Sequence, residues 1–205
     1  MRLDIVEWWV HWAGAVATSV CLIAALAGMA RGLRRPRGRT TGLARRVLRL
    51  PAYLLIGVLF FGPCFLLWRP LPLALSASAR AVALALGALL CFPGLALYLW
   101  ARLTLGEMYN VSSSMGAQLY ADHRLVTHGP FAFVRHPMYL GIILASAGGL
   151  LIYRTWTLLF TIVTFLGLVL RAWREEQALA AEFGERWEEY CWQVPGWIPR
   201  ILRRR

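Results

Sequence analysis

Four long apolar runs constrain the fold of this chain more than any other feature of its sequence. They cover roughly residues 6–30, 48–68, 79–105 and 138–170. A helix needs about 20 apolar residues to cross a bilayer, and the fourth run is interrupted at Tyr153-Arg154-Thr155. This break favours a tight hairpin of two helices. We therefore expect an all-α integral membrane protein with about five transmembrane helices.

The placement of arginine predicts how these helices are oriented. All 22 basic residues are arginine; eight lie between the first two expected spans, three between the third and fourth, and seven after the fifth. Only four lie on the opposite side. Basic loops stay on the cytoplasmic side of a membrane, so we expect the N-terminus outside and the C-terminus in the cytoplasm. Because the arginines flank the spans, the net charge of +12 indicates contact with membrane lipids and excludes a nucleic-acid partner.

The chain divides into two expected parts. Residues 1–103 hold three spans, and residues 104–205 hold a loop (106–135), the helical hairpin and a C-terminal amphipathic helix. Acidic residues are absent between Glu7 and Glu107 and return in the second part, where we place the function. Within the loop, residues 119–120 and 125–126 are expected to be short extended segments.

The first polar cluster is Gly-Pro-Phe-Ala-Phe-Val-Arg-His-Pro-Met-Tyr-Leu-Gly, residues 129–141. Pro137 is suited to the first position of a helix, whose free N–H groups can bind an anion, and Arg135 can add a charge-assisted bond to the same anion. The plainer alternative is a capped helix start, with Arg135 reaching toward lipid phosphates.

The second polar cluster follows the hairpin, at residues 171–176. Arg171 and Glu175 are four residues apart and can pair on one helix face; the plainer alternative is a salt bridge at the membrane interface, which is worth little. Both clusters are expected at the cytoplasmic face. Further on, Leu179, Phe183, Trp187 and Tyr190 recur at helical spacing, which predicts one amphipathic helix that continues through Gly184.

The sequence lacks the residue patterns typical of metal binding, covalent catalysis and dinucleotide binding. The cysteines are widely spaced without a C-x-x-C pair, and no carboxylate or cysteine completes a ligand set with His123, His128 and His136, so no metal is expected. No serine, cysteine or lysine stands in a nucleophile motif. No G-x-G-x-x-G follows a strand, so a soluble dinucleotide fold is not expected.

Taken together, the two clusters resemble the integral-membrane isoprenylcysteine carboxyl methyltransferases, a family that also groups with phospholipid methyltransferases. The similarity covers roughly residues 104–200. The matching residues are 123–127, 129–131, 135–141, Arg171, Glu175-Glu176, Phe183-Gly184, Tyr190 and Val194-Pro195.

The resemblance implies a fold, a cofactor and a site. S-adenosylmethionine would bind at the cytoplasmic face, leaving S-adenosylhomocysteine as product, while a lipophilic acceptor enters sideways from the bilayer. The acceptor group would be a carboxylate first, with an amine or thiol as the other options. Arg171 and Glu175 are the expected catalytic residues. The residues expected to line the cofactor pocket are Gln118, His123, Leu125, Val126, Phe131, His136, Pro137, Tyr139, Arg171 and Glu175. Phe131 stands where the family often has tyrosine.

Two alternatives stay open at this stage. Membrane sterol and enoyl reductases use NADPH and share an R-H-P-N-Y-x-G-E signature, but Met138 and Ile142 replace its asparagine and glutamate here. A non-catalytic membrane accessory protein is the other. The lysine-free, arginine-rich composition favours a GC-rich bacterial genome and hence a bacterial inner membrane. The identity of the acceptor and the oligomeric state are not determined by the sequence.

Overall fold

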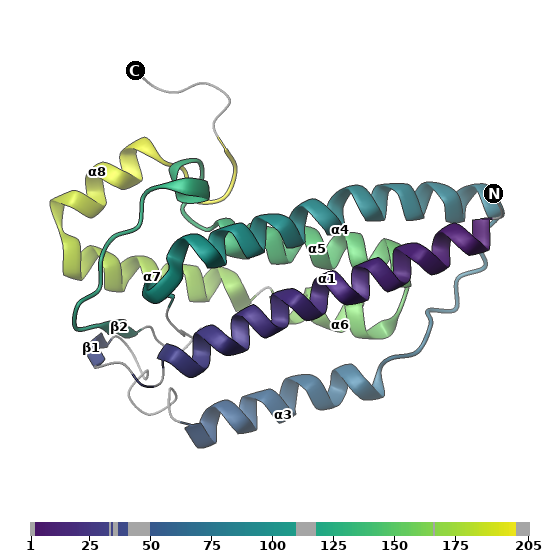
Figure 1. Cartoon of the computed structure of the whole chain (residues 1–205), viewed down its shortest axis with the longest axis horizontal. Helices are drawn as coiled ribbons and strands as arrows, with labels where there is room; N and C mark the ends of the chain where they lie inside the picture. Colours follow the sequence, from purple (N-terminus) through teal and green to yellow (C-terminus); the bar gives the residue numbers. More distant parts are fainter. Residues whose placement is uncertain are drawn as a thin grey trace.

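The structure is a computed structural model that describes residues 3–32, 34, 37–40, 50–109, 118–165 and 167–199. These residues form a helical bundle with one two-stranded sheet at its end (Figure 1). The long helices are α1 (Leu3–Gly32), α3 (Leu50–Leu66), α4 (Ala77–Leu105), α5 (Pro137–Tyr153) and α7 (Gly167–Phe183). The shorter elements are α6 (Trp156–Phe165), α8 (Glu185–Gln193), the 3₁₀ turns η1 (Gly106–Met108) and η2 (Gly129–Ala132), and strands β1 (Arg37–Thr40) and β2 (Gln118–Tyr120).

The expected apolar runs are helical in the part of the chain that the structure describes. Among the described residues, Leu3–Gly32, Ala77–Met108 and Trp156–Phe183 are long and apolar enough to cross a membrane, and Leu54–Leu66 and Pro137–Tyr153 are shorter apolar helices. The break in the fourth run is also confirmed, because α5 ends at Tyr153 and Arg154 adopts a left-handed conformation with φ 49°. This turn sends α6 back along the bundle, as the hairpin interpretation requires.

Glycines let α4 and α5 pack at backbone contact. A Cβ at Gly94 would lie 2.8 Å from the carbonyl oxygen of Gly141, and a Cβ at Gly148 would lie 2.5 Å from that of Gly87. Side chains at these positions would force the helices apart. Close packing through small residues is the usual way in which apolar helices associate in lipid, where burial of apolar surface supplies little driving force. The pair α4–α5 is therefore the rigid centre of the bundle.

An ion-pair network holds the N-terminal end of the bundle, at the right in Figure 1. Glu7 of α1 is buried and accepts hydrogen bonds from Arg80 of α4 and from Arg154 at the α5–α6 turn. Asp4 adds a second acceptor for Arg80 at 3.1 Å. Close by, the Tyr153 hydroxyl donates to the carbonyl of His11 at 2.7 Å. These contacts tie three helices together at the end of the molecule that lies opposite the two polar clusters.

The C-terminal amphipathic segment departs from the expected single helix. Gly184 adopts φ 51°, which ends α7 at Phe183 and starts α8 at Glu185. The prediction of one continuous helix is therefore wrong, because glycine enters this left-handed region without the steric cost that a Cβ imposes. The apolar residues on the two sides of the break still meet in one cluster, since Leu179 and Phe183 pack on Trp187 and Tyr190. The turn at Gly184 therefore packs the apolar face of α8 against the apolar residues at the end of α7.

The loop between α4 and α5 crosses the end of the bundle beside β1. Residues 119–120 belong to β2, which pairs antiparallel with β1, so the first expected extended segment is confirmed. Leu125 and Val126 lie in irregular chain and form no strand. Residues 110–117 lie outside the described residues, as do the side chain of Gln118 and most of the arginine-rich link between α1 and α3.

Candidate active site

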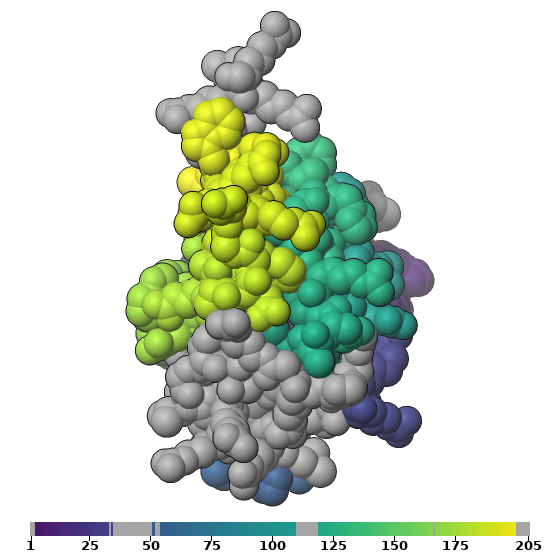
Figure 2. All heavy atoms as spheres, turned by 90° about the vertical axis from the view of Figure 1, so that its left-hand side faces the viewer, coloured from purple at the N-terminus to yellow at the C-terminus, as the bar shows by residue number. Residues whose placement is uncertain are grey.

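The two polar clusters meet at one end of the molecule, as the hairpin predicts. Figure 2 views this end, where the green segment that begins at residue 118 lies beside the yellow α8. Leu125 from the loop packs on the cluster formed by Trp187, Tyr190 and Val194. The Tyr190 hydroxyl donates to the carbonyl of Phe131 at 2.7 Å. Burial raises the pKa of Tyr190, so the hydroxyl keeps its proton and this hydrogen bond.

Glu176 joins α7 to the start of α5. Its Oε1 lies 2.7 Å from Nε2 of His136 and 3.0 Å from Nη2 of Arg135. Arg135 also donates from Nη1 to the carbonyls of Cys191 and Val194, at 3.2 and 2.9 Å. The interpretation that Arg135 binds an external anion therefore receives no support, because Glu176, the last turn of α8 and the residue that follows α8 take up its donors. These bonds are charge-assisted and directional, so they fix the position of the His136 ring.

The chain beyond α8 closes over the same point. The amides of Arg135 and His136 donate to the carbonyls of Pro195 and Gly196, at 2.9 and 3.0 Å. The ring of Trp197 then lies 5.2 Å from His136, measured between centroids. As expected, α5 begins at Pro137, with His136 as its N-cap residue.

Glu175, the neighbour of Glu176, contacts a different set of residues. The Tyr139 hydroxyl donates to Glu175 Oε1 at 2.5 Å, and Arg171 Nε lies 3.5 Å from the same oxygen. The guanidinium of Arg171 lies over the Tyr139 ring, 5.4 Å from its centroid. The expected i, i+4 pair is confirmed, and Tyr139 completes a three-residue polar group. A carboxylate, a cation and a phenol are thus held together where α5 and α7 face each other.

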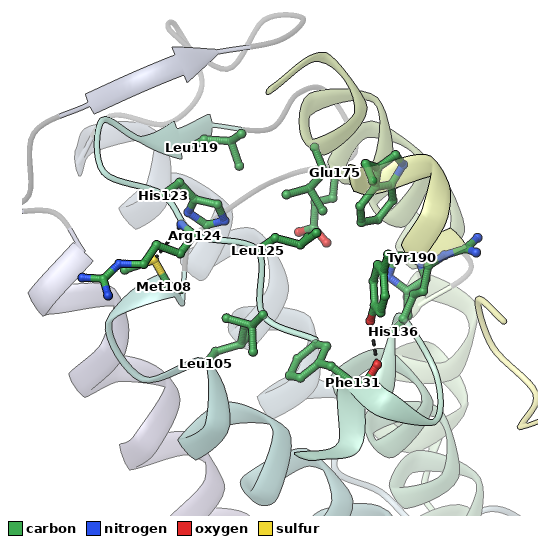
Figure 3. Close-up of a pocket in the computed structure, with 14 residues that line it drawn as sticks. Leu105, Met108, Leu119, His123, Arg124, Leu125, Phe131, His136, Glu175 and Tyr190 are labelled. Carbon is green, nitrogen blue, oxygen red and sulfur yellow. Dashed lines mark hydrogen bonds between the residues drawn. The ribbon is translucent and has the colours of Figure 1, made fainter. Parts of the chain in front are cut away.

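Two cavities adjoin this group. The larger opens between the loop, α7 and α8, and Figure 3 shows the Glu175 carboxylate pointing into it, with His136 and Tyr190 on the same side and Met108 and His123 across from them. The smaller lies toward α5 and α7. Both cavities share a wall of Leu105, Phe131, Arg135, His136 and Glu175.

Nearly all of the residues expected at the pocket line one of these cavities. The larger is lined by His123, Leu125, Val126, Phe131, His136 and Glu175, and the smaller by Phe131, His136, Pro137, Tyr139, Arg171 and Glu175. Gln118 lies in β2, but its side chain is outside the described residues, so its role stays a prediction.

Several lining residues were not expected from the sequence. They are Leu105, Met108, Tyr109, Leu119, Arg124, Met138, Leu179, Trp187 and Tyr190. For Leu179, Trp187 and Tyr190 a signal existed, because their helical spacing marks an apolar face. That face packs partly against the loop and partly borders the cavity. No pattern singled out Leu105 or Met108, which belong to the end of an otherwise ordinary apolar span.

The sequence and the fold of this chain are similar to those of known membrane methyltransferases. A sequence model of the family described as phospholipid methyltransferase matches residues 82–186, about half of the chain. The chain belongs to the phospholipid methyltransferase family. The matched range of this family member runs from α4 through the loop and hairpin into α8, and so includes both polar clusters. The division of the chain after residue 103 stays a prediction.

Individual relatives of this family member are isoprenylcysteine methyltransferases. It is 39% identical over 82 residues to the protein-S-isoprenylcysteine O-methyltransferase of Schizosaccharomyces pombe. The aligned region covers 39% of this chain and 35% of that protein. It is 33% identical over 118 residues to the enzyme of the same name from Tribolium castaneum, covering 57% of this chain and 41% of that protein. The chain thus spans less than half the length of these relatives.

A solved structure supports the fold. The structure of the eukaryotic intramembrane Ras methyltransferase, isoprenylcysteine carboxyl methyltransferase, matches with a TM-score of 0.50 and 26% sequence identity. The match covers 75% of this chain and 54% of that one. Together with the apolar helices, it identifies this family member as an all-α integral membrane protein.

Proposed function

We propose that this protein is an S-adenosylmethionine-dependent methyltransferase that acts on a lipophilic acceptor in the membrane. The observation that carries the proposal is the position of Glu175, which lines two adjoining cavities and is paired with Arg171 and Tyr139. Two substrates that must react with each other need two neighbouring sites with polar groups at the junction. Membership of the methyltransferase family supports the same conclusion.

The residues of the larger cavity fit this cofactor. Leu125, Val126, Phe131 and Trp187 supply apolar and aromatic surface against which a purine can pack. Glu175 supplies a carboxylate that can accept hydrogen bonds from ribose hydroxyls or an amino group and can attract a positive charge. When bound, S-adenosylmethionine supplies a methyl group activated by its attachment to a cationic sulfur.

The smaller cavity suits an anionic acceptor. Arg171 lines it together with Tyr139, and a guanidinium binds a carboxylate through paired, charge-assisted hydrogen bonds. A carboxylate is already ionised and needs no general base, whereas an amine or a thiol would have to lose a proton. These residues contribute by holding the acceptor close and aligned and by excluding water. A carboxylate acceptor is therefore the first choice.

The acceptor should reach this cavity from the bilayer. The cavity lies at the C-terminal end of α4 and the start of α5, beside the first half of α7. α4 and α5 are apolar helices, and α7 continues the apolar stretch that begins at Trp156. The arginine distribution supports a cytoplasmic location for this end, with the N-terminus outside. The relatives named above are eukaryotic, so location in a bacterial inner membrane rests on composition alone and stays a prediction.

Cofactor choice can be tested on purified protein in detergent. Calorimetric titration with S-adenosylmethionine and with NADPH should show saturable binding of the first and none of the second. The NADPH-dependent reductase interpretation requires the reverse result. Saturable NADPH binding without S-adenosylmethionine binding would overturn the proposal.

Acceptor class can be tested with a matched pair. A long-chain lipophilic acid and its primary amide have the same apolar body, but only the acid carries an anion. With labelled S-adenosylmethionine, the acid should become labelled and the amide should not, as followed by mass spectrometry. If a lipid amine became labelled and the acid did not, the proposed methyltransferase activity would stand, but the proposed carboxylate acceptor would be wrong.

A further inference from the structure

A third cavity lies between the C-terminal ends of α1 and α4, outside the proposed active site. It measures about 320 Å³. The residues that line it are Gly28, Arg31 and Gly32 of α1, Arg34, Gly106 and Glu107 of η1, and Tyr109. Arg31 and Arg34 are exposed on its walls, and Glu107 is the one acidic residue among the described residues that line it. Tyr109 lines this cavity and also the smaller cavity that contains Arg171, so the two are neighbours.

A buried arginine lies directly behind the wall of this cavity. Arg102 of α4 is 2% exposed. Its Nη1 donates to the carbonyl of Gly106 at 3.3 Å, and its guanidinium lies 4.1 Å from the centroid of the Tyr109 ring. On the other side it touches α1, where a Cβ at Gly28 would collide with Nη2. Gly28, Gly106 and Tyr109 all line the cavity, so Arg102 is separated from it by a single layer of residues.

The guanidinium of Arg102 is incompletely satisfied. Its Nε and Nη2 are buried and have no hydrogen-bond partner among the described residues. Arginine stays protonated in proteins, and a buried charge without a counter-charge is strongly unfavourable. A cation–π contact and one carbonyl offset only part of this cost. Arg31 and Arg34 add charge of the same sign, against the single carboxylate of Glu107, so the described residues in and behind the cavity wall carry a net positive charge that favours an anion.

We propose that this cavity binds the phosphate of an anionic lipid headgroup. α1 and the helical stretch from α4 through η1 are both long enough to cross a membrane, and both end here, which places the cavity at headgroup depth. Arginine is well suited to phosphate because its planar fork matches the oxygens. The bound phosphate would lie one layer of residues away from Arg102, whose positive charge attracts it, and beside the proposed active site.

This inference does not depend on methyl transfer, and binding can be measured directly. The full chain in mixed micelles would be offered equal amounts of phosphatidylglycerol and phosphatidylcholine, and the retained lipid would be measured by native mass spectrometry. Wild-type protein should retain phosphatidylglycerol preferentially. Arg31→Gln should reduce this preference about fivefold, the effect of one arginine at a membrane surface. Arg102→Met should also reduce it, because the charge of Arg102 acts across a single layer of residues. Arg186→Gln, an exposed change on α8, is the matched control and should behave as wild type.

Three results would overturn the assignment. The first is equal retention of the two lipids by the wild type. The second is unchanged preference in Arg31→Gln, a substitution at an exposed position that does not threaten folding, whatever the behaviour of Arg102→Met. The third is displacement of the retained lipid by millimolar inorganic phosphate, which would assign the cavity to free phosphate instead.

Discussion

Replacing Glu176 by glutamine should destabilise the protein and loosen the wall of the active site. The carboxylate accepts hydrogen bonds from Arg135 and His136. The exposed fraction of the side chain is 27% for Glu176, 17% for Arg135 and 6% for His136. Exposed ion pairs contribute about 1 kcal/mol or less, while breaking a fully buried one costs about 3–5 kcal/mol. This cluster is mostly buried, and glutamine retains one acceptor. We therefore expect Glu176→Gln to lower the free energy of unfolding by about 2 kcal/mol, a value between these limits.

This loss is measurable as a shift in melting temperature. For a chain of this size, 1 kcal/mol corresponds to about 2–4 °C, so Glu176→Gln should melt about 4–8 °C lower in detergent. Glu188→Gln, an exposed change on α8, is the matched control and should melt with the wild type. Because Glu176 fixes His136 in the cavity wall, binding of S-adenosylmethionine should weaken as well. A Glu176→Gln protein with wild-type melting and wild-type affinity would refute the assigned role.

Further predictions concern the site, the helix pair and the acceptor. Glu175→Gln and His136→Ala should each weaken binding of S-adenosylmethionine about tenfold or more, the value of a hydrogen bond to a charged group; calorimetry that gives wild-type affinity for both would rule out this site. Gly148→Leu should destabilise the bundle by about 1–3 kcal/mol, because its side chain meets the backbone of α4; an unchanged melting temperature would contradict the close packing. Turnover should rise with acceptor chain length, by about 1–3 kcal/mol per methylene, until the cavity is full, and a water-soluble acceptor used equally well would argue against entry from the bilayer.

Much of the architecture follows from the sequence alone. Apolar runs of membrane length predict the long helices, and the polar break around Arg154 predicts the α5–α6 hairpin. The hairpin in turn predicts that the two polar clusters meet at one end. The Arg171–Glu175 pair follows from helical spacing. Each of these features depends on residues close together in the chain, where hydropathy and periodicity are sufficient.

The break at Gly184 shows where such periodicity is insufficient. The spacing of apolar residues from Leu179 to Tyr190 is the same whether the segment is one helix or two that fold on each other. A glycine in this position is compatible with both. The packing of both halves against the loop, through residues such as Leu125, favours the folded form.

Ion-pair partners were decided by the tertiary structure. Glu175 and Glu176 are neighbours in sequence, yet one binds Tyr139 and the other binds His136, because successive residues on a helix point about 100° apart. Arg102 is the opposite case, an ordinary arginine near the end of a span that becomes buried without a full set of partners only when α1 packs over it. Hydropathy along a chain determines which segments enter the membrane, but the partner of a charge depends on contacts of a few ångströms between segments far apart in sequence, and only the packed helices determine those.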